Sequence, residues 1–265
     1  MKKRILSLMM AVAFATTLLF AGCGSNEDTK DGETPLESKE ESGSDETLVM
    51  ATNATFPPYE YVEGNDYLGI DVEIAGEIAD MLDMELEIQD VEFDSIIAGV
   101  QTGKYDMGMA GMTVTDERKQ SVNFTDTYAS GIQSVIVAEG SGIASVDDIS
   151  SETRVGVQQG TTGDIYASDD YGDEAITRFK TGADAVQALL TNKVDCVIID
   201  NEPAKAFVSA NEGLTILDTS YAEEDYAICV AKDNEELLNK INDALSELKS
   251  SGKIDEIVSK YISAE

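Results

Sequence analysis

Short apolar runs alternate with segments of helical periodicity from residue 48 onward. Residues 71–82 show the helical pattern well, because apolar residues recur there three or four positions apart. The apolar runs, which predict strands, cover residues 48–51, 86–88, 105–109, 132–138, 155–158, 194–199 and 226–231. Helices are predicted over residues 71–82, 93–101, 185–190, 203–209, 237–248 and 254–261, with another beginning near 115–117. This alternation predicts an α/β protein with mostly parallel sheets.

An internal similarity suggests that two parts of the chain share one construction. Residues 98–111 (AGVQTGKYDMGMAG) and 187–200 (QALLTNKVDCVIID) both read as helix, turn, Lys-x-Asp and buried strand, at a constant offset of 89 residues. In this register Gly111 and Asp200 stand at equivalent strand ends. Chance is a competing explanation, because short helix–turn–strand units resemble one another. If the register is right, two lobes each present a polar group to one cleft.

The junction at residues 110–119 (AGMTVTDERK) has the features of a ligand site. Strand ends are where open α/β sheets bind ligands, and Gly111 would leave the backbone there open to close approach. Thr113 offers a hydroxyl, and Arg118 offers a planar set of donors that fits a carboxylate. The pattern fits a pocket for a small carboxylate, and equally a helix cap with an exposed arginine.

Composition excludes several classes of function. The chain has 265 residues, of which 42% are hydrophobic and 26% charged, enough for one large or two small domains with a sizeable core. Its formal net charge of −34 argues against nucleic acid as a partner, because the phosphates would be repelled. Histidine is absent, so a Ser-His-Asp triad and a histidine-based zinc site are excluded. We expect neither a metal nor a cofactor.

Two cysteines and one acidic cluster need no special chemistry. Cys196 and Cys229 lie inside apolar runs and are predicted to be small buried hydrophobes; a disulfide between them has no spacing signature behind it. Residues 169–174 are mostly acidic, but their spacing is not that of an EF-hand. We interpret this cluster as a solvated loop.

Residues 1–22 are predicted to be an export signal, with a basic start and an apolar region that is too short to span a membrane comfortably. The small residues before Cys23 resemble a bacterial lipobox, whose cysteine becomes lipid-modified after cleavage. Phe20 stands where leucine is usual, and an ordinary signal peptide with an incidental cysteine is the alternative. On the lipoprotein interpretation, residues 23–46 are the modified cysteine and a tether.

The tether is predicted to be disordered, because residues 24–46 carry nine acids, two lysines and almost no apolar side chains. The leader contributes +3 to the net charge and the tether −7, which leaves −30 for residues 47–265. The acidity therefore belongs mainly to the folded part of the chain.

Nearly all of residues 48–262 resembles the solute-binding proteins of ABC importers for polar amino acids. The matching motifs, in the family's order, are ATNATFPPYEY (51–61), GIDVEIAGEIA (69–79), AGMTVTDERKQSVNFT (110–125), VGVQQGTTGD (155–164), VDCVIIDNEPA (194–204) and YAICVAKDNEELLNKINDAL (226–245). The resemblance implies a two-lobe periplasmic-binding-protein (Venus-flytrap) fold of α/β class with two hinge strands. Lobe 1 would comprise residues 47–131 with 226–265, and lobe 2 residues 132–225. It also implies binding without catalysis.

Carried over by motif, the resemblance implies a site for the α-carboxylate of an amino acid. Arg118 would form the ion pair, and Thr113 and the backbone N–H of Thr162 would add hydrogen bonds. Thr161 and Thr162 follow Gly160 at a strand-to-helix junction, where free N–H groups favour an anion. A plain helix N-cap formed by the two threonines is the competing interpretation.

The resemblance implies further contacts with the rest of the ligand. Asp200 would pair with the α-ammonium, helped by the carbonyl of Gly111, although a capping role before Pro203 competes with this interpretation. The side chain of the ligand would contact Phe56 and Phe93 as an aromatic sandwich and Asn53 and Gln158 at its far end. Placement of the two phenylalanines in the core is the alternative.

The aromatic sandwich and Asn53 favour glutamine, arginine, lysine or histidine as the ligand. Asn53 replaces an aspartate found in some relatives, which weakens the case for a strongly cationic ligand. The resemblance also implies an ABC permease and its ATPase as partners, a monomeric receptor, and a place on the extracytoplasmic face of the membrane, held only by the lipid at Cys23. A periplasmic dehydratase of the same fold and a tethered amino-acid sensor are the alternatives.

Overall fold

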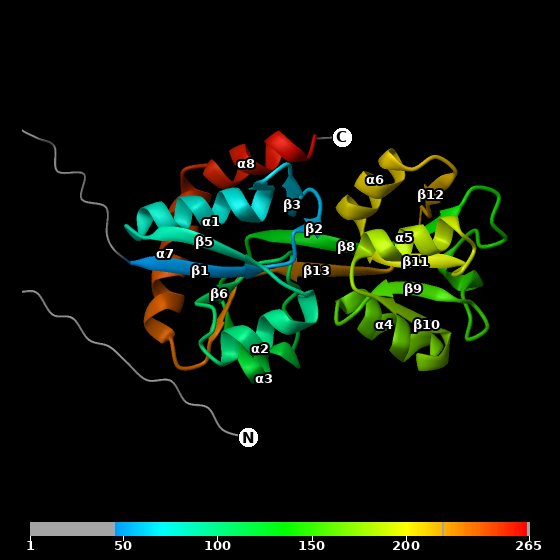
Figure 1. The fold of residues 1–265 in the computed structure, drawn as a ribbon, viewed down its shortest axis with the longest axis horizontal. Helices are drawn as coiled ribbons and strands as arrows, with labels where there is room; N and C mark the ends of the chain where they lie inside the picture. The colour runs from blue at the N-terminus through cyan, green and yellow to red at the C-terminus, as the bar shows by residue number, and fades with distance from the viewer. Residues whose placement is uncertain (1–45, 219, 264–265) are drawn as a thin grey trace, which may run out of the picture. The chain divides into compact units, whose positions relative to one another are not determined.

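The computed structural model describes residues 46–218 and 220–263. The predicted signal, Cys23 and almost all of the predicted tether lie outside these residues. Within them, two large β-sheets with helices on both faces form two lobes (Figure 1). No helix of this described part is both long enough and apolar enough to cross a membrane.

The first lobe is built on a five-stranded sheet of order β5-β1-β6-β14-β7. Its strands are β1 (Thr47–Thr52), β5 (Glu85–Asp90), β6 (Met107–Gly108), β14 (Cys229–Ala231) and β7 (Val122–Phe124). Strand β1 is parallel to β5 and β6, whereas β14 is antiparallel to β6 and β7. A small antiparallel sheet of β2 (Thr55–Phe56), β3 (Glu60–Glu63) and β4 (Asp66–Leu68) precedes the first helix.

Helices cover both faces of this first sheet, so its strands are buried on both sides. The helices are α1 (Ile70–Met81), α2 (Ile96–Gln101) after a 3₁₀ turn at Phe93–Ser95, α3 (Arg118–Ser121), α7 (Glu235–Ser250) and α8 (Lys253–Tyr261). Side chains alternate along β1 as the period of a strand requires. Met50 packs with Ile74 of α1, and Ala51 points to the other face, toward Ile96 of α2.

The second lobe is built on a six-stranded sheet of order β10-β9-β11-β8-β12, in which β13 also pairs with β8. Its strands are β8 (Ala129–Ala138), β9 (Val155–Gln158), β10 (Ile176–Phe179), β11 (Cys196–Asp200), β12 (Leu214–Ile216) and β13 (Ala222–Tyr226). Its helices are α4 (Thr162–Tyr171), α5 (Gly182–Leu190) and α6 (Asn201–Ala210), with 3₁₀ turns at Val146–Asp148 and Asp173–Ala175. Alternate residues of β11 again face opposite helical layers.

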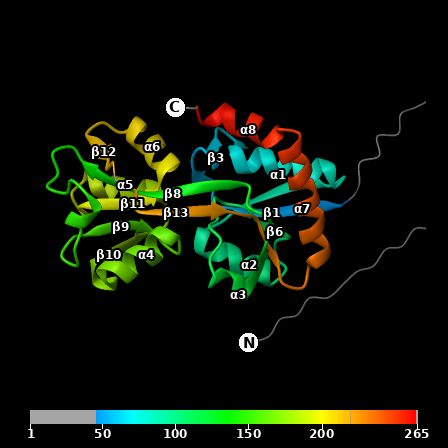
Figure 2. The same cartoon turned by 180° about the vertical axis from the view of Figure 1, so that it is seen from behind.

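Strands β8 and β13 run side by side between the lobes (Figures 1 and 2). They are antiparallel, and their paired residues extend from Gln133 and Ala222 to Ala129 and Tyr226. Beyond β13, the N–H of Ala227 bonds the carbonyl of Met112 at 3.1 Å, which brings the chain back into the first lobe. These two strands are the predicted hinge. The lobe boundaries at residues 131–132 and 225–226 stay a prediction.

Several local expectations were wrong. The sheets are mixed, because five of the nine pairings described in the two large sheets are antiparallel. The predicted strand at 226–231 is two strands, since residues 227–228 cross from the hinge into the first lobe. The predicted helix near residues 115–117 is only the single turn α3. The acidic cluster at 169–174 belongs to the end of α4 and the following 3₁₀ turn, not to a solvated loop.

The internal similarity is confirmed in the hydrogen bonding of the two lobes. Asp106 Oδ2 accepts the backbone N–H of Val49 in β1 at 2.8 Å. At the equivalent position in the second lobe, Asp195 Oδ2 accepts the backbone N–H of Arg154 at 2.9 Å, next to β9. The strand registers agree as well, because Met107 pairs with Met50 as Cys196 pairs with Val155. The offset of 89 residues therefore relates two copies of one structural unit.

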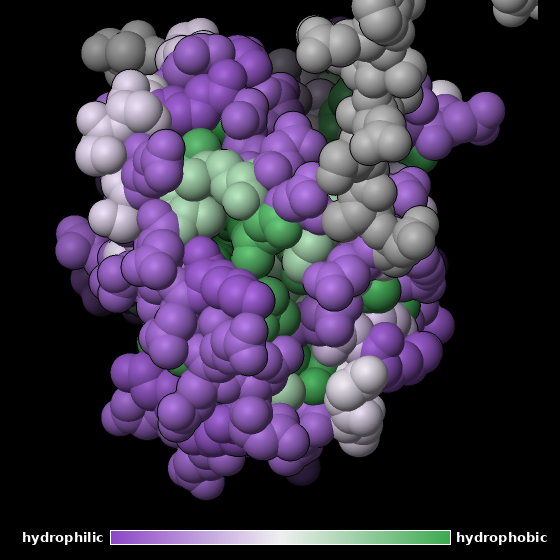
Figure 3. Space-filling view, turned by 90° about the vertical axis from the view of Figure 1, so that its left-hand side faces the viewer, coloured by the Kyte–Doolittle hydropathy of each residue, from purple (hydrophilic) through white to green (hydrophobic). Residues whose placement is uncertain are grey.

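The acidic residues lie mainly on the surface, and the apolar residues lie mainly inside. Figure 3 shows the outer end of the first lobe, where hydrophilic residues cover most of the visible face and hydrophobic residues show between them. Met81, at the end of α1, is 41% exposed and is one of three large apolar side chains of the described residues with substantial exposure. Cys196 and Cys229 are buried free thiols, as predicted.

Candidate functional site

A narrow cavity lies between the lobes, at the ends of strands from both sheets. Its lining includes every residue that the sequence predicted to bind ligand: Asn53, Phe56, Phe93, Gly111, Thr113, Arg118, Gln158, Thr161, Thr162 and Asp200. Glu60 and Ala110 complete the lining. The cavity has a volume of about 10 Å³, which is room for about one water molecule. A ligand of amino-acid size can therefore enter only when the lobes move apart.

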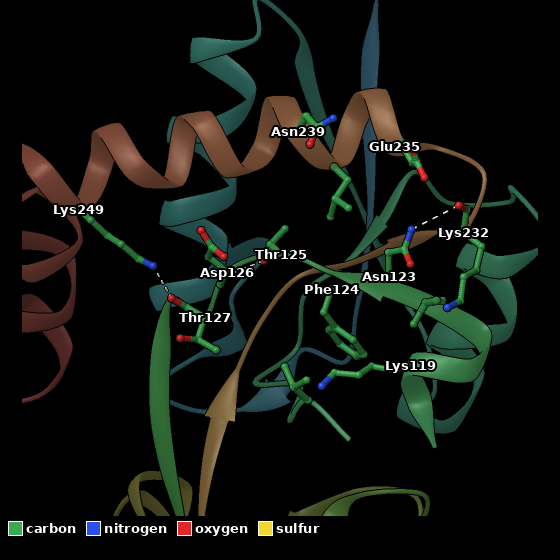
Figure 4. A pocket seen from close by; sticks show the side chains of 13 residues that line it. Lys119, Asn123, Phe124, Thr125, Asp126, Thr127, Lys232, Glu235, Asn239 and Lys249 are labelled. Carbon is green, nitrogen blue, oxygen red and sulfur yellow. Dashed lines mark hydrogen bonds between the residues drawn. The ribbon is translucent and has the colours of Figure 1, made fainter. Parts of the chain in front are cut away.

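A much larger groove, of about 870 Å³, lies on the first lobe beside β7 and α7 (Figure 4). Three lysines border it, and one of them, Lys249, donates to the carbonyl of Thr127. Asn123 donates to the carbonyl of Lys232 on the other side of the groove. No buried side-chain atom without a hydrogen-bond partner belongs to its lining among the described residues, whereas the cavity contains one in Glu60. We therefore place the candidate site in the cavity.

Arg118 occupies one end of the cavity and is only 7% exposed. Its Nη1 donates to the carbonyl of Thr113 at 2.6 Å, and its Nη2 reaches across to the carbonyl of Gly160 at 3.1 Å. The guanidinium lies over the ring of Phe93, 5.4 Å from its centre. Burial lowers the pKa of Arg118, and the negative charge of Glu224 opposes that effect. The group is a buried, oriented cation that suits a carboxylate.

Glu224 supports this end of the cavity, and the sequence reasoning missed it. It lies on hinge strand β13 and is 6% exposed. Its Oε2 accepts hydrogen bonds from Thr113 Oγ1 and Gln133 Nε2, both at 3.0 Å. No pattern in the sequence distinguishes Glu224 from the acids on either side of it, because only tertiary packing buries it.

The two threonines at the start of α4 have different roles. Thr161 is the helix N-cap: its hydroxyl accepts the N–H of Asp164 at 3.3 Å and donates to the carbonyl of Gln158 at 2.8 Å. Thr162 begins the helix and is 2% exposed, and its N–H belongs to the first turn, where no helical partner exists. Its hydroxyl lies 3.4 Å from that of Thr113 in the first lobe. This helix start favours an anion near Arg118.

Asp200 stands at the end of β11, and its side chain does not cap the following helix. Its carboxylate instead accepts a hydrogen bond from the hydroxyl of Tyr226. Burial, together with the negative charge of Glu224, raises the pKa of Asp200 to about 7. The capping interpretation is therefore wrong, and the carboxylate is free of the helix to take a cationic partner.

Amide and aromatic groups form the remaining walls. Gln158 Nε2 donates to Asn53 Oδ1 at 2.9 Å, which joins the two lobes at this point. Asn53 also donates to the carbonyl of Val91 at 2.8 Å, so the protein already uses part of its amide. Gly111 has φ +51°, and a Cβ there would lie 2.9 Å from a ring carbon of Phe56. Only glycine therefore fits between that ring and the cavity.

Glu60 and Asp71 form a buried pair of acids, which the sequence reasoning also missed. Glu60 lines the cavity and is 1% exposed, while Asp71 is fully buried behind it. Glu60 Oε2 and Asp71 Oδ1 are both buried and have no hydrogen-bond partner among the described residues. Burial raises both pKa values, that of Asp71 to about 6 and that of Glu60 well above its usual range, and the negative charge of Asp71 adds to the rise at Glu60. An acid inside the aromatic run PPYEY is the signal that would have found Glu60.

The cavity therefore holds one cation and two acidic groups in separate places. Arg118 is its cation, while Asp200 and Glu60 are its two acids. Such an arrangement binds a small molecule that has one anionic and at least one cationic group. No group of three or more Cys, Asp or Glu side chains within residues 46–218 and 220–263 is arranged to hold a metal ion.

Comparisons with known proteins agree with this arrangement. Residues 48–264 match the family described as bacterial extracellular solute-binding proteins, family 3. The arginine-binding extracellular protein ArtP of Bacillus subtilis is 33% identical over 97% of this chain and 98% of its own length. A probable histidine-binding protein of Neisseria gonorrhoeae is 32% identical over 82% of this chain and 83% of its own. The structure of the arginine-, lysine-, histidine-binding protein ArtJ of Geobacillus stearothermophilus has a TM-score of 0.79 and 33% identity, covering 83% of this chain and 96% of that one.

Proposed function

Because the chain belongs to the bacterial extracellular solute-binding proteins of family 3, we propose that its cavity captures a cationic L-amino acid, with arginine as the preferred ligand. As a member of this family it is an extracytoplasmic solute-binding protein and not an enzyme. The observation that carries the choice of ligand is the set of buried charges, one cation (Arg118) against two acids (Asp200 and Glu60). Arginine carries the complementary set, one carboxylate, one ammonium and one guanidinium.

The proposed roles divide the ligand among these groups. Arg118 binds the α-carboxylate through paired N–H donors, with Thr113 and the N–H of Thr162 beside it. Asp200 and the carbonyl of Gly111 bind the α-ammonium. Each end of the ligand takes partners from both lobes, so the full set of partners forms only when the lobes close on the ligand. Differential affinity for the closed state is how a ligand shifts such an equilibrium.

The side chain of the ligand lies between aromatic walls and ends at polar groups. Phe56 and Phe93 contact its aliphatic part, and Asn53, Gln158 and Glu60 surround its far end. On sequence alone, Asn53 weakened the case for a strongly cationic ligand. Glu60 removes that objection, because its carboxyl group can supply the negative charge that asparagine lacks. The ligands named for the three relatives described above, arginine, lysine and histidine, support the same choice, whereas a glutamine-binding protein of Bacillus subtilis is 30% identical to this chain.

Membership of this family supports a proposal for the partners, and the residues before Cys23 support one for the attachment of the protein. We propose that the loaded, monomeric receptor delivers its ligand to an ABC permease driven by an ATPase. A lipid on Cys23 would hold the protein at the outer face of the membrane, with residues 24–46 as the spacer. Globomycin treatment of producing cells tests the anchor, because inhibition of the lipoprotein signal peptidase should leave an uncleaved precursor. An unchanged, released protein would contradict lipid attachment.

A binding screen tests the ligand assignment. The purified protein is titrated calorimetrically with each of the twenty amino acids and with citrulline, the neutral isostere of arginine. We expect arginine to bind best and citrulline to bind at least tenfold more weakly, a difference of about 1.4 kcal/mol. Equal binding of arginine and citrulline would contradict the preference for a cation. A complete lack of binding would favour the tethered sensor with a vestigial cleft.

A further inference from the structure

We infer that Glu60 and Asp71 hold one proton between them and that this proton leaves when a cationic side chain binds, so that uptake of arginine is coupled to proton release. The inference rests on the proposed function, because it needs a ligand whose cation reaches Glu60. Nothing in the family match or in the names of the relatives concerns a proton.

The hydrogen bonds around the pair show which acid is ionised. Asp71 Oδ2 accepts two donors, the N–H of Gly111 at 2.8 Å and the hydroxyl of Tyr128 at 2.8 Å. Its other oxygen, Oδ1, and Glu60 Oε2 are both buried and receive no donor from any other described residue. Two carboxylate oxygens cannot satisfy each other, whereas one proton between them satisfies both. Glu60 therefore carries the proton, and Asp71, with two donors already, carries the charge.

Among the described residues, the groups that surround the pair are mainly acids and phenols. The other titratable or charged groups that face Glu60 from the elements packed around it are Tyr59, Asp90 of β5, Tyr128, Asp200 of β11 and, across the cavity, Arg118. The nearest of these are acids or phenols, and the guanidinium of Arg118 is engaged by two carbonyls. Two buried like charges in contact are strongly unfavourable, so the pair keeps its proton until a cation arrives.

The exchange balances without any further reactant. A neutral Glu60 carboxyl meets a guanidinium that is already protonated and keeps its own protons. The O–H bond of Glu60 breaks, the carboxylate forms an ion pair with the guanidinium, and the proton passes to the buffer. The net charge of the cavity is unchanged, because one positive charge enters as another leaves. Binding of a neutral side chain leaves the Glu60 proton in place.

Asp200 also changes its protonation when a ligand binds, and a comparison of arginine with citrulline cancels this contribution to the proton count. Every amino acid brings an α-ammonium to Asp200, so every ligand drives the same proton change there. Citrulline has the backbone groups and length of arginine but a neutral urea end. The number of protons released with arginine minus the number released with citrulline therefore reports the side-chain acid alone.

Calorimetry in buffers of different ionisation enthalpy counts these protons. At pH 6 we expect arginine to release up to one proton more than citrulline, and the ratio of their affinities to rise by up to about tenfold per pH unit while Glu60 is protonated. In Glu60→Gln the extra proton disappears and the affinity ratio no longer depends on pH. Glu63→Gln, an exposed glutamate on the same strand β3, should behave like the wild type. Equal proton release by the two ligands, or an extra proton that persists in Glu60→Gln, would overturn the inference.

A second measurement does not depend on the variant. Carbon-13 NMR of the labelled wild-type protein follows the side-chain carboxyl of Glu60 directly. The carboxyl signal should show the protonated form without ligand and with citrulline, and the ionised form with arginine. An ionised Glu60 in all three samples would overturn the inference while arginine binding itself still supported the proposed function. A protein that binds arginine no better than citrulline would instead contradict the proposed function.

Discussion

The two lobes are built from the same unit but present different chemistry to the cavity. In each unit a threonine closes the turn before a strand, because Thr102 bonds the carbonyl of Ala98 at 2.9 Å and Thr191 bonds that of Gln187 at 2.8 Å. At the equivalent position near the end of this strand, the first lobe has Gly111 and the second has Asp200. The two units thus share the same backbone arrangement and some of the same hydrogen bonds. The residues that they place at the cavity, Gly111 and Asp200, differ.

Where the two lobes contact each other, residues at equivalent positions of the two units bind to one another. Asn53 directly follows β1, and Gln158 is the last residue of β9, the equivalent strand. Their amides are hydrogen-bonded across the cavity. Glu92 and Lys180 likewise follow β5 and β10 and form an ion pair of 2.9 Å. Arg118 has no counterpart in this relation, because it lies on the short helix α3 beyond the repeated stretch, whereas the second lobe continues directly from β11 into α6. The comparison shows that closure uses the repeated positions, while recognition depends on a residue that only one lobe has.

Removal of the Arg118 side chain should have the largest effect on ligand affinity. In Arg118→Ala the ligand carboxylate is buried without a partner, and we expect affinity for arginine to fall by about 3–5 kcal/mol. Isothermal calorimetry measures the loss, with the neighbouring exposed Lys119→Ala as the control that keeps wild-type affinity. Affinity within tenfold of the wild type in Arg118→Ala would mean that recognition is shared between the lobes.

Replacing Asp200 of the second lobe by a neutral residue should have opposite effects on stability and on ligand binding. Because the folded-state pKa of Asp200 is raised to about 7, its contribution to stability is present below pH 4 and is lost as pH rises through 7. Asp200→Asn should therefore be more stable than the wild type at pH 8, by roughly 2–4 kcal/mol, and equally stable near pH 4. Urea denaturation of the ligand-free proteins measures the difference.

The same variant should bind more weakly. At pH 8 the ionised Asp200 pairs with the α-ammonium, so Asp200→Asn loses about 2–3 kcal/mol of binding. In the wild type, affinity should weaken as pH falls below 7, because the ammonium must then displace a proton. A variant that loses stability at pH 8, or keeps full affinity there, would show that Asp200 is a structural residue like its neighbours in β11.

The repeated scaffold predicts matched losses in the two lobes. Asp106→Ala and Asp195→Ala each leave a backbone N–H without its acceptor, which costs about 1–3 kcal/mol of unfolding free energy. The salt bridge of Asp195 with Arg154 is substantially exposed and adds little. Chemical denaturation measures both, with the exposed Asp66→Ala as a control. Losses that differ by more than about 2 kcal/mol would argue that the two units are not energetically equivalent.

The ion pair between the lobes should give the smallest effect. Lys180→Ala and Glu92→Ala remove a contact that exists only when the lobes are closed, and both side chains are well exposed. We expect each to weaken arginine binding by about 0.2–1 kcal/mol, with no further loss in the double variant. The effect should vanish at 1 M salt, where exposed charges are screened. A loss that survives high salt would point to a structural defect in one lobe.

Periodicity and motif order predicted most of the helices, seven of the strands and the residues that line the cavity, because these depend on local sequence. Other strands, among them β7, β10, β12 and most of β13, were missed. The direction of a strand does not depend on local sequence, so the prediction of mostly parallel sheets missed the antiparallel pairings of β8 and β14. The hydrophobic pattern records burial but not orientation. Gly111, Arg118 and Asp200 were found because they lie in motifs at strand ends.

The buried acids could not be found in the same way. Glu60 and Glu224 resemble the many surface acids of this chain, and only the packing of distant segments buries them. Asp71 looked like an ordinary first-turn acid of a helix, which is where acids are common. Its partners Gly111 and Tyr128 are 40 and 57 residues away in the sequence. Tertiary contacts, not local propensity, decide which acids of such a chain acquire unusual protonation.

Both ends of the described chain belong to the first lobe. Strand β1 begins at Thr47, and the last helix, α8, packs on α1, where Lys260 and Tyr261 both bond Glu73. A mechanical load applied at Thr47 therefore enters the first lobe and does not pass through β8 and β13. The second lobe is joined to the first through these two strands, so a force applied at Thr47 leaves it without tension.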